Sequence, residues 1–330
     1  MTIKYNNVYI QDASTVTGPY EAKGPLSKHF DKSYDDLYMG SDTWEQAEIK
    51  MLVDSVDLLL NKTKLLKTDI DLFISGDLLN QLVASNYASA TLKIPYLGIY
   101  SACASSAEGI LIGASLLSNN QISRCICSVS SHNTGAEKQF RNPTEYGTPK
   151  PKYTTFTSTG AASILLSNNK SDIKVESATI GITCDAGIKD AFNMGAVMAP
   201  AAAETIFKHL NDLKREPGYY DLILTGDLGL YGKNILIDYM KTQYGIDIEK
   251  NYNDCGVMLY DIKNQPVMAG ASGPCSSALV TYSYILNKMK KGELSRVLLV
   301  ATGALMSQTS VNQKLSIPSI AHAVSLEVIE

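Results

Sequence analysis

The sequence predicts an α/β protein made of two similar halves, each with helices layered on a mixed, mostly parallel sheet. Three observations predict this fold. Short apolar runs alternate with segments of helical length, which is the pattern of strand–helix–strand units with right-handed crossovers. Several motifs recur in the same order in both halves. A chain of 330 residues is long for one hydrophobic core and ordinary for two.

The repeated motifs define the halves. They are "DLFISGDLL" (71–79) with "DLILTGDLG" (221–229), "CASSA" (103–107) with "CSSAL" (275–279), and "ISRCICSVS" (122–130) with "LSRVLLVAT" (294–302). One match could arise by chance, but three in the same order indicate an internal duplication. The polar "SNNKSD" at 167–172 is typical of a turn. We therefore expect an N-terminal half over 1–168 and a C-terminal half over 169–330.

The elements of the first half follow from periodicity and capping signals. Thr43 and Gln46 fit a capping box at the start of a helix over 43–61, whose apolar residues share one face. Strands are predicted over 70–76, 95–101 and 124–131. Helices are predicted over 78–92, ending before Pro95, and over 103–118. Two such sheets around shared helices give a layered α-β-α-β-α fold.

Composition and charge exclude several classes of protein. Hydrophobic residues make up 45% of the chain and charged residues 19%, as in ordinary globular proteins. The net charge is −4 and the Lys and Arg residues are scattered, which argues against nucleic-acid binding. We expect no signal peptide, because "MTIKYNNVYI" has no apolar run followed by a small-residue cleavage site. We expect no transmembrane helix, because no apolar run approaches the ~20 residues needed to span a bilayer. Six cysteines without regular spacing do not indicate disulfides.

Motifs along nearly the whole chain carry a family resemblance. They include "GPLSKHFDKSYDD" (24–36), "SGDLLNQ" (75–81), "SACASSAEG" (101–109), "SSHNTGAEKQFRNPTEYG" (130–147), "MGAVMAPAAAETI" (194–206), "NDCGVMLYD" (253–261) and "IPSIAHAV" (317–324). The chain resembles the thiolase superfamily, which includes the ketoacyl synthases, and within it the stage V sporulation protein AD family of spore-forming bacteria.

This resemblance implies a function that composition and periodicity do not indicate. It implies non-catalytic binding of pyridine-2,6-dicarboxylic acid (dipicolinic acid), either free or as its calcium chelate, to support uptake of this acid into the developing spore. It further implies a homodimer that works with membrane channel proteins of the same system, at the cytoplasmic side of the spore inner membrane. No cofactor and no nucleic-acid partner are expected.

Cys103 is the residue on which enzymatic activity depends. Its predicted place at a helix N-terminus would favour a thiolate and would also offer backbone N–H groups to an anion. A condensing enzyme needs acid–base partners as well. Aligning the strands puts Gly226, or Asp227 after a shift of one, where the synthases have a histidine. Ala271 falls near their asparagine, and Ser319 falls on the second cysteine of the thiolases. We therefore expect no catalytic residue, although His322 or His132 could compensate.

The remaining candidate ligand-binding residues have structural alternatives. His132 and Asn133 follow a strand end, where ligands of α/β sheets gather, or they are loop residues bound to backbone. Arg141 could anchor a carboxylate or form a surface ion pair. Asp77 and Asp227 could contact calcium held by the ligand, although capping of the helices that follow them is favoured. Cys275, the counterpart of Cys103, is expected to be structural, and no protein metal site is expected.

Three hypotheses follow for the function of the chain. The first is a non-catalytic ligand-binding protein that serves a spore membrane channel. The second is a thioester-dependent acyltransferase that uses Cys103. The third is a structural dimeric component of the channel complex. The shortage of acid–base partners favours the first and third, and the polar residues around 130–141 favour the first over the third.

Overall fold

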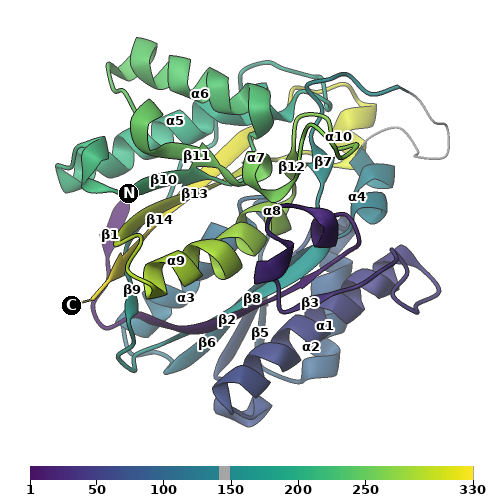
Figure 1. The fold of residues 1–330 in the computed structure, drawn as a ribbon, viewed down its shortest axis with the longest axis vertical. Helices are drawn as coiled ribbons and strands as arrows, with labels where there is room; N and C mark the ends of the chain where they lie inside the picture. Colours follow the sequence, from purple (N-terminus) through teal and green to yellow (C-terminus); the bar gives the residue numbers. More distant parts are fainter. Residues whose placement is uncertain (141–148, 330) are drawn as a thin grey trace.

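The strands of the computed structural model, which describes residues 1–140 and 149–329, form a sheet that encloses a central layer of helices (Figure 1). The sheet is mixed and contains twelve of the described strands, in the order β11-β10-β13-β14-β9-β2-β8-β6-β4-β5 with β1 beside β9 and β3 beside β2. The strands of the first half are β1 (Thr2–Lys4), β2 (Tyr9–Thr17), β3 (Lys32–Ser33), β4 (Leu72–Gly76), β5 (Tyr96–Gly98), β6 (Arg124–Ser131), β7 (Phe156–Thr157) and β8 (Gly160–Ser167). Those of the second half are β9 (Ile173–Thr179), β10 (Leu222–Thr225), β11 (Tyr252–Asp254), β12 (Ala271–Ser272), β13 (Arg296–Ala304) and β14 (Ser319–Val328).

The strand order is symmetric about the pair formed by β2 and β9. Outward from β2 come β8, β6, β4 and β5, and outward from β9 come β14, β13, β10 and β11. In each series the first two strand pairs, counted outward from β2 or β9, are antiparallel and the following two pairs are parallel. The prediction that the strands in 71–79 and 221–229 are equivalent is therefore confirmed. The division of the chain at residue 168 stays a prediction.

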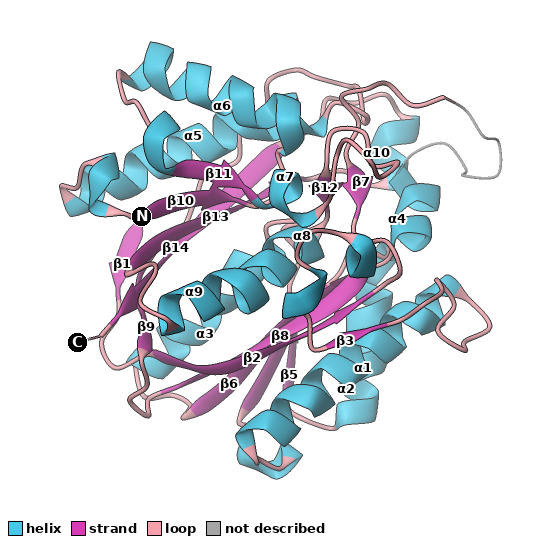
Figure 2. Ribbon diagram, in the orientation of Figure 1, coloured by secondary structure: helices cyan, strands magenta, loops and turns pink. Residues whose placement is uncertain are grey.

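Helices form three layers around the two halves of the sheet (Figure 2). The outer layer on the first half contains α1 (Trp44–Thr63) and α2 (Val83–Leu92), and α5 (Met194–Leu213) and α6 (Gly229–Tyr244) cover the second half. The central layer contains α3 (Ser105–Ser118) and the continuous run α8 (Pro274–Leu279), a π-helical turn (Val280–Ile285) and α9 (Leu286–Lys290). The short helices α4 (Asn133–Phe140), α7 (Cys255–Leu259) and α10 (Gln308–Asn312) lie at the strand ends. The layering is the predicted α-β-α-β-α.

The repeated Asp-Leu and Ser-Arg motifs make the same hydrogen bonds in both halves. The Asp71 carboxylate accepts hydrogen bonds from the backbone N–H groups of Ser123 (2.7 Å) and Arg124 (2.9 Å). The Asp221 carboxylate does the same with Ser295 (2.6 Å) and Arg296 (2.9 Å). Each aspartate thus joins the start of one central strand to the start of its parallel neighbour. The Asp-Leu and Ser-Arg motifs together set the strand register in both halves.

Two predicted helices begin later than expected. The helix predicted from residue 78 begins at Val83, because Gln81 and Leu82 adopt left-handed backbone conformations (φ 57° and 58°). The helix predicted from residue 103 begins at Ser105. By contrast α1 begins at Trp44, with the Thr43 hydroxyl accepting the Gln46 N–H at 3.2 Å as the capping signal predicted.

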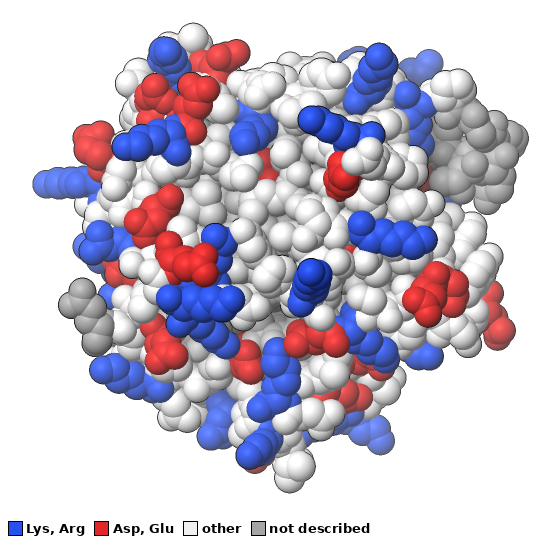
Figure 3. All heavy atoms as spheres, viewed as in Figure 1, with Lys and Arg blue, Asp and Glu red and all other residues white. Residues whose placement is uncertain are grey.

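The visible surface carries both signs of charge. Lys and Arg side chains are interspersed with Asp and Glu over the face shown in Figure 3, without a broad region of one sign. Within 1–140 and 149–329, the structure has no helix with the length and apolar character needed to cross a membrane.

Candidate functional site

Cys103 lies in a tight turn between β5 and α3. Ala102, which precedes it, has a left-handed backbone (φ 49°), and the Ser105 hydroxyl donates to the Ala102 carbonyl at 2.8 Å. Gly303 at the end of β13 packs against this turn so closely that a Cβ there would lie 2.2 Å from the Ser101 carbonyl oxygen. The Cys103 side chain is 5% exposed. Cys103 therefore lies two residues before the helix, and the second half of the chain covers it.

Asp227 is the carboxyl group that contacts Cys103. The Thr302 hydroxyl donates to Asp227 Oδ1 at 2.6 Å, the Gly273 N–H donates to Oδ2 at 3.1 Å, and the Cys103 side chain is a third hydrogen-bond partner. Burial raises the Asp227 pKa to about 7, although the bonds from Thr302 and Cys103 act in the opposite direction. Asp227 therefore lies in surroundings that disfavour its ionised form.

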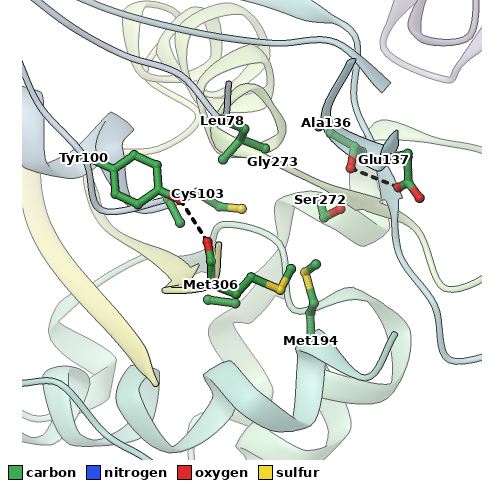
Figure 4. A pocket seen from close by; sticks show the side chains of 12 residues that line it. Leu78, Tyr100, Cys103, Ala136, Glu137, Met194, Ser272, Gly273 and Met306 are labelled. Carbon is green, nitrogen blue, oxygen red and sulfur yellow. Dashed lines mark hydrogen bonds between the residues drawn. The ribbon is translucent and has the colours of Figure 1, made fainter. Parts of the chain in front are cut away.

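An inner cavity of about 20 Å³ opens beside Cys103 (Figure 4). It has room for about one water molecule. Its lining is mostly apolar and comes from several distant segments, namely Leu78, Tyr100, Ala102, Cys103, Ala136, Glu137, Thr157, Met194, Ser272, Gly273, Ala304 and Met306. A pyridine ring therefore does not fit beside Cys103 in this conformation.

Glu137 is the one charged residue in the described lining of the inner cavity. The Thr157 hydroxyl donates to Glu137 Oε1 at 3.1 Å, and the ammonium group of Lys150 lies 2.7 Å from Oε2. The Glu137 side chain is buried on α4, whose sequence belongs to the polar motif at 130–147. Sequence analysis missed this residue, because the motif gave no reason to choose Glu137 over the polar residues beside it.

A larger outer cavity of about 650 Å³ adjoins the inner one. The two share Leu78, Tyr100 and Met306, and the Tyr100 hydroxyl donates to the Met306 carbonyl at 3.3 Å between them. Its other described lining residues carry amide, hydroxyl or apolar side chains and no charge: Leu79, Asn80, Gln81, Leu82, Gln139, Leu305, Ser307, Gln308, Thr309 and Ser310. The volume is in the range of small-molecule sites.

His132 and Asn133 line neither cavity. The His132 Nε2 hydrogen donates to the Leu37 carbonyl at 2.8 Å, and Nδ1 accepts the Gly135 N–H at 3.4 Å. The Asn133 amide donates to the Thr157 carbonyl at 3.1 Å. Both residues thus match the structural alternative, in which loop polar groups bind backbone.

Asp77 caps a helix, and its repeat counterpart Asp227 does not. The Asp77 carboxylate accepts the backbone N–H groups of Leu79 (2.9 Å) and Ser85 (2.8 Å), the latter in the first turn of α2. Burial raises the Asp77 pKa. Asp77 and Asp227 therefore have different roles, and no group of three or more His, Cys, Asp or Glu residues in the described chain is arranged to hold a metal ion.

His322 and Ser319 lie on β14, outside both cavities. The His322 ring bonds to the Ser101 hydroxyl at 3.4 Å and accepts the Gly181 N–H at 3.3 Å, and burial lowers its pKa to about 4. His322 is therefore neutral and turned toward Ser101. Ser319 pairs through its backbone with Cys184.

Two other predicted residues complete the account. Arg141 lies outside the described residues. The Cys275 thiol is buried in α8 and donates to the Gly160 carbonyl at 2.9 Å, in agreement with a structural role.

Comparison with known proteins assigns the family. The family model described as stage V sporulation protein AD matches residues 1–327. The chain belongs to the stage V sporulation protein AD family. Stage V sporulation protein AD of Bacillus subtilis (strain 168) is 45% identical to this member of the family over 320 residues, which cover 97% of this chain and 94% of that protein.

Solved structures show that the fold of the family is thiolase-like. Cerulenin-bound OleA from Xanthomonas campestris superposes with a TM-score of 0.64 at 13% identity, covering 98% of this chain and 100% of that one. The 3-oxoacyl-[acyl-carrier-protein] synthase III from Aquifex aeolicus VF5 superposes with a TM-score of 0.57 at 13% identity, covering 97% and 99%. At this identity the likeness establishes the fold of this sporulation protein and not its chemistry.

Proposed function

We propose that this chain binds dipicolinate without reacting with it, as the neutral calcium chelate, and so supports uptake of dipicolinate into the developing spore. The observation that carries the proposal is the outer cavity, which is large enough for the ring and has no charged side chain in its described lining. A free dicarboxylate would bring two uncompensated negative charges to this lining. Calcium cancels both, so the chelate is the form that suits the uncharged side chains of the described lining better.

Neutral donors and one aromatic ring supply the contacts. The amides of Asn80, Gln81 and Gln308 and the hydroxyls of the segment 307–310 can donate to carboxylate oxygens. Tyr100 offers a flat face at the inner end of the cavity, where a pyridine ring can stack.

The surroundings of Cys103 support binding rather than condensation. The thiol is buried beside the Asp227 carboxyl, and the sequence alignment with the synthases puts Gly226, or Asp227 after a shift of one, at the position of their histidine base. His322 could have compensated, but both of its ring nitrogens bind other groups, and burial lowers its pKa to about 4, which makes its imidazole a weak base. A thiol without a positioned base and oxyanion donors loses most of the acceleration that such enzymes achieve.

The partners expected from the family resemblance belong to the same proposal. The chain would act at the surface of the spore inner membrane together with membrane channel proteins of the same system. Within the described residues β5 is an edge strand, and it exposes Leu97 without a charged or proline residue between Tyr96 and Gly98. An uncharged edge of this kind favours pairing with another strand. We therefore propose a homodimer contact along β5.

Isothermal titration calorimetry with dipicolinate, with and without calcium, tests the proposed function. The chelate should bind more tightly than the free dicarboxylate. Benzene-1,3-dicarboxylate has the same two carboxylates without the ring nitrogen that helps to hold calcium, so it is the matched control and should bind weakly in both conditions. Absence of binding by dipicolinate with and without calcium would rule the proposal out.

A further inference from the structure

The inner and outer cavities meet at the side chain of Tyr100. Leu78, Tyr100 and Met306 line both cavities, and the Tyr100 hydroxyl bonds to the Met306 carbonyl at 3.3 Å (Figure 4). We propose that Tyr100 is a gate between them. In the closed state seen here the inner cavity holds about one water molecule, and the Cys103 thiol can be reached from the outer cavity only when the contact between Tyr100 and Met306 opens.

The contact between Tyr100 and Met306 is weak enough to break and re-form. One hydrogen bond between neutral groups contributes only modestly to stability, so the closed state is favoured but not locked. Tyr100 is 43% exposed, so its ring can turn outward without leaving a void in the core. Met306 lies between the end of β13 at Ala304 and the start of α10 at Gln308, outside both elements.

Two methionines allow the inner cavity to enlarge after the gate opens. Met194 at the start of α5 and Met306 both line the inner cavity, and their side chains lie near each other on its side opposite Leu78 (Figure 4). Methionine is unbranched and changes rotamer readily, so it adapts to a group that enters. The lining of the inner cavity also includes the small side chains of Ala102, Ala136 and Ala304.

A ligand in the outer cavity should keep the gate closed. A ring that stacks on Tyr100 from the outer side would block the outward turn of the tyrosine. This coupling rests on the proposed function, whereas the gate itself does not. Ligand binding would then protect a thiol that the ligand does not touch.

The rate of Cys103 alkylation by iodoacetamide, followed by peptide mass spectrometry, tests the gate. Alkylation joins sulfur to the reagent carbon, releases iodide and requires loss of the thiol proton, so the rate reports access to the sulfur together with its ionisation. Cys184, which is partly exposed and lines neither cavity, is an internal standard in the same sample. Tyr100→Phe removes the hydroxyl and keeps the ring, and should raise the ratio of Cys103 to Cys184 labelling about two- to tenfold.

Further variants distinguish a gate from general loosening of the fold. Tyr100→Ala should raise the labelling ratio more than Tyr100→Phe. Tyr87→Phe, at an exposed tyrosine outside both cavities, should leave it unchanged. Equal ratios in the wild type, Tyr100→Phe and Tyr100→Ala would overturn the gate, and so would wild-type Cys103 that reacts as fast as Cys184.

A last measurement separates the ligand coupling from the gate. Saturating calcium dipicolinate should lower Cys103 labelling in the wild type and leave Cys184 labelling unchanged. If calorimetry shows binding but Cys103 labelling does not slow, the coupling is wrong. If calorimetry shows no binding, the proposed function fails, and the Tyr100 variants still decide whether the gate exists.

Discussion

The side chains of Cys103 and Asp227 form a hydrogen-bonded pair that joins the two halves of the fold. Cys103 precedes α3 in the first half, and Asp227 follows β10 in the second. In the first half, Asp77 caps α2. In the second half Asp254 accepts the backbone N–H groups of Leu228 and Gly229, both at 2.9 Å, at the start of α6. Because Asp254 binds these N–H groups, the Asp227 carboxyl does not cap α6, and it contacts the Cys103 thiol instead.

The raised pKa of Asp227 predicts how stability depends on pH. Burial raises this pKa from 3.8 to about 7, so the folded state binds a proton that the unfolded state has already lost. The associated stability is complete below about pH 4 and is lost as the pH rises through 7. Asp227→Asn should therefore make the free energy of unfolding depend less on pH between 5 and 8. One unit of pKa difference between the folded and unfolded states corresponds to about 1.4 kcal/mol, so the fall in this free energy between the two pH values should shrink by up to a few kcal/mol.

Urea unfolding at pH 5 and pH 8 measures this change. Asp238→Asn, at an exposed aspartate on α6, is the control and should behave as the wild type. Part of the slope should remain in Asp227→Asn, because burial also raises the pKa of Glu21 to about 7 and that of Asp254 to about 6. An unchanged slope would show that Asp227 is ionised in the folded protein.

Substitution of Cys103 tests where the ligand lies. Cys103→Ala keeps the turn and does not alter the outer cavity. The affinity for calcium dipicolinate should therefore stay within about twofold of the wild-type value, which corresponds to the ±0.5 kcal/mol typical of changes away from a critical contact. Cys103→Phe must force a ring into about 20 Å³ and should cost about 1–3 kcal/mol of stability. Calorimetry and urea unfolding measure the two effects. Loss of binding in the alanine variant would place the ligand in the inner cavity instead.

Charge substitutions at Gln308 test the neutrality of the bound species. Gln308 lines the outer cavity and is exposed, so a new charge should be tolerated. For the free dicarboxylate, Gln308→Lys should tighten binding and Gln308→Glu should weaken it, each by a few-fold, since a nearby charge pair in water is worth about 1 kcal/mol. For the calcium chelate both changes should be smaller. Asn234→Lys on α6 is the control, and equal effects on both ligand forms would contradict a neutral bound species.

A charge on the edge strand tests the homodimer. Leu97→Asp introduces a carboxylate into β5, where Leu97 is 45% exposed, and should convert a dimer into a monomer in sedimentation velocity experiments. Leu230→Asp changes a similarly exposed leucine on α6 and should leave the dimer intact. A dimer that withstands Leu97→Asp and dissociates with Leu230→Asp would place the interface on α6.

The elements that local chemistry determines were predictable, and those set by distant contacts were not. Thr43 and a regular apolar face predicted α1 to within a residue at its start. The start of α3 was placed too early, because the left-handed backbone at Ala102 follows from packing against Gly303, some two hundred residues away.

The candidate site was predictable only around its cysteine. Tyr100 is three residues from Cys103, yet its sequence gives no sign that its hydroxyl meets the carbonyl of Met306. Met194 and Met306 come from separate segments of the second half, and an isolated methionine is indistinguishable from a core residue. The position of His132 after a strand end was compatible with a ligand-binding role or with a bond to backbone, and its ring binds backbone. For Asp77 the sequence favoured helix capping, and its carboxylate does accept backbone N–H groups at the start of α2.

The paired aspartates Asp71 and Asp221 suggest how a duplicated gene could specialise without losing its architecture. Both lie at the amino ends of their strands, whereas Cys103, Asp227 and the cavities lie beyond the carboxyl ends. The contacts that align the strands therefore lie at the opposite end of the sheet from the proposed ligand site. Substitutions at the carboxyl ends can therefore change the residues around Cys103 while Asp71 and Asp221 keep the strands aligned at the amino ends.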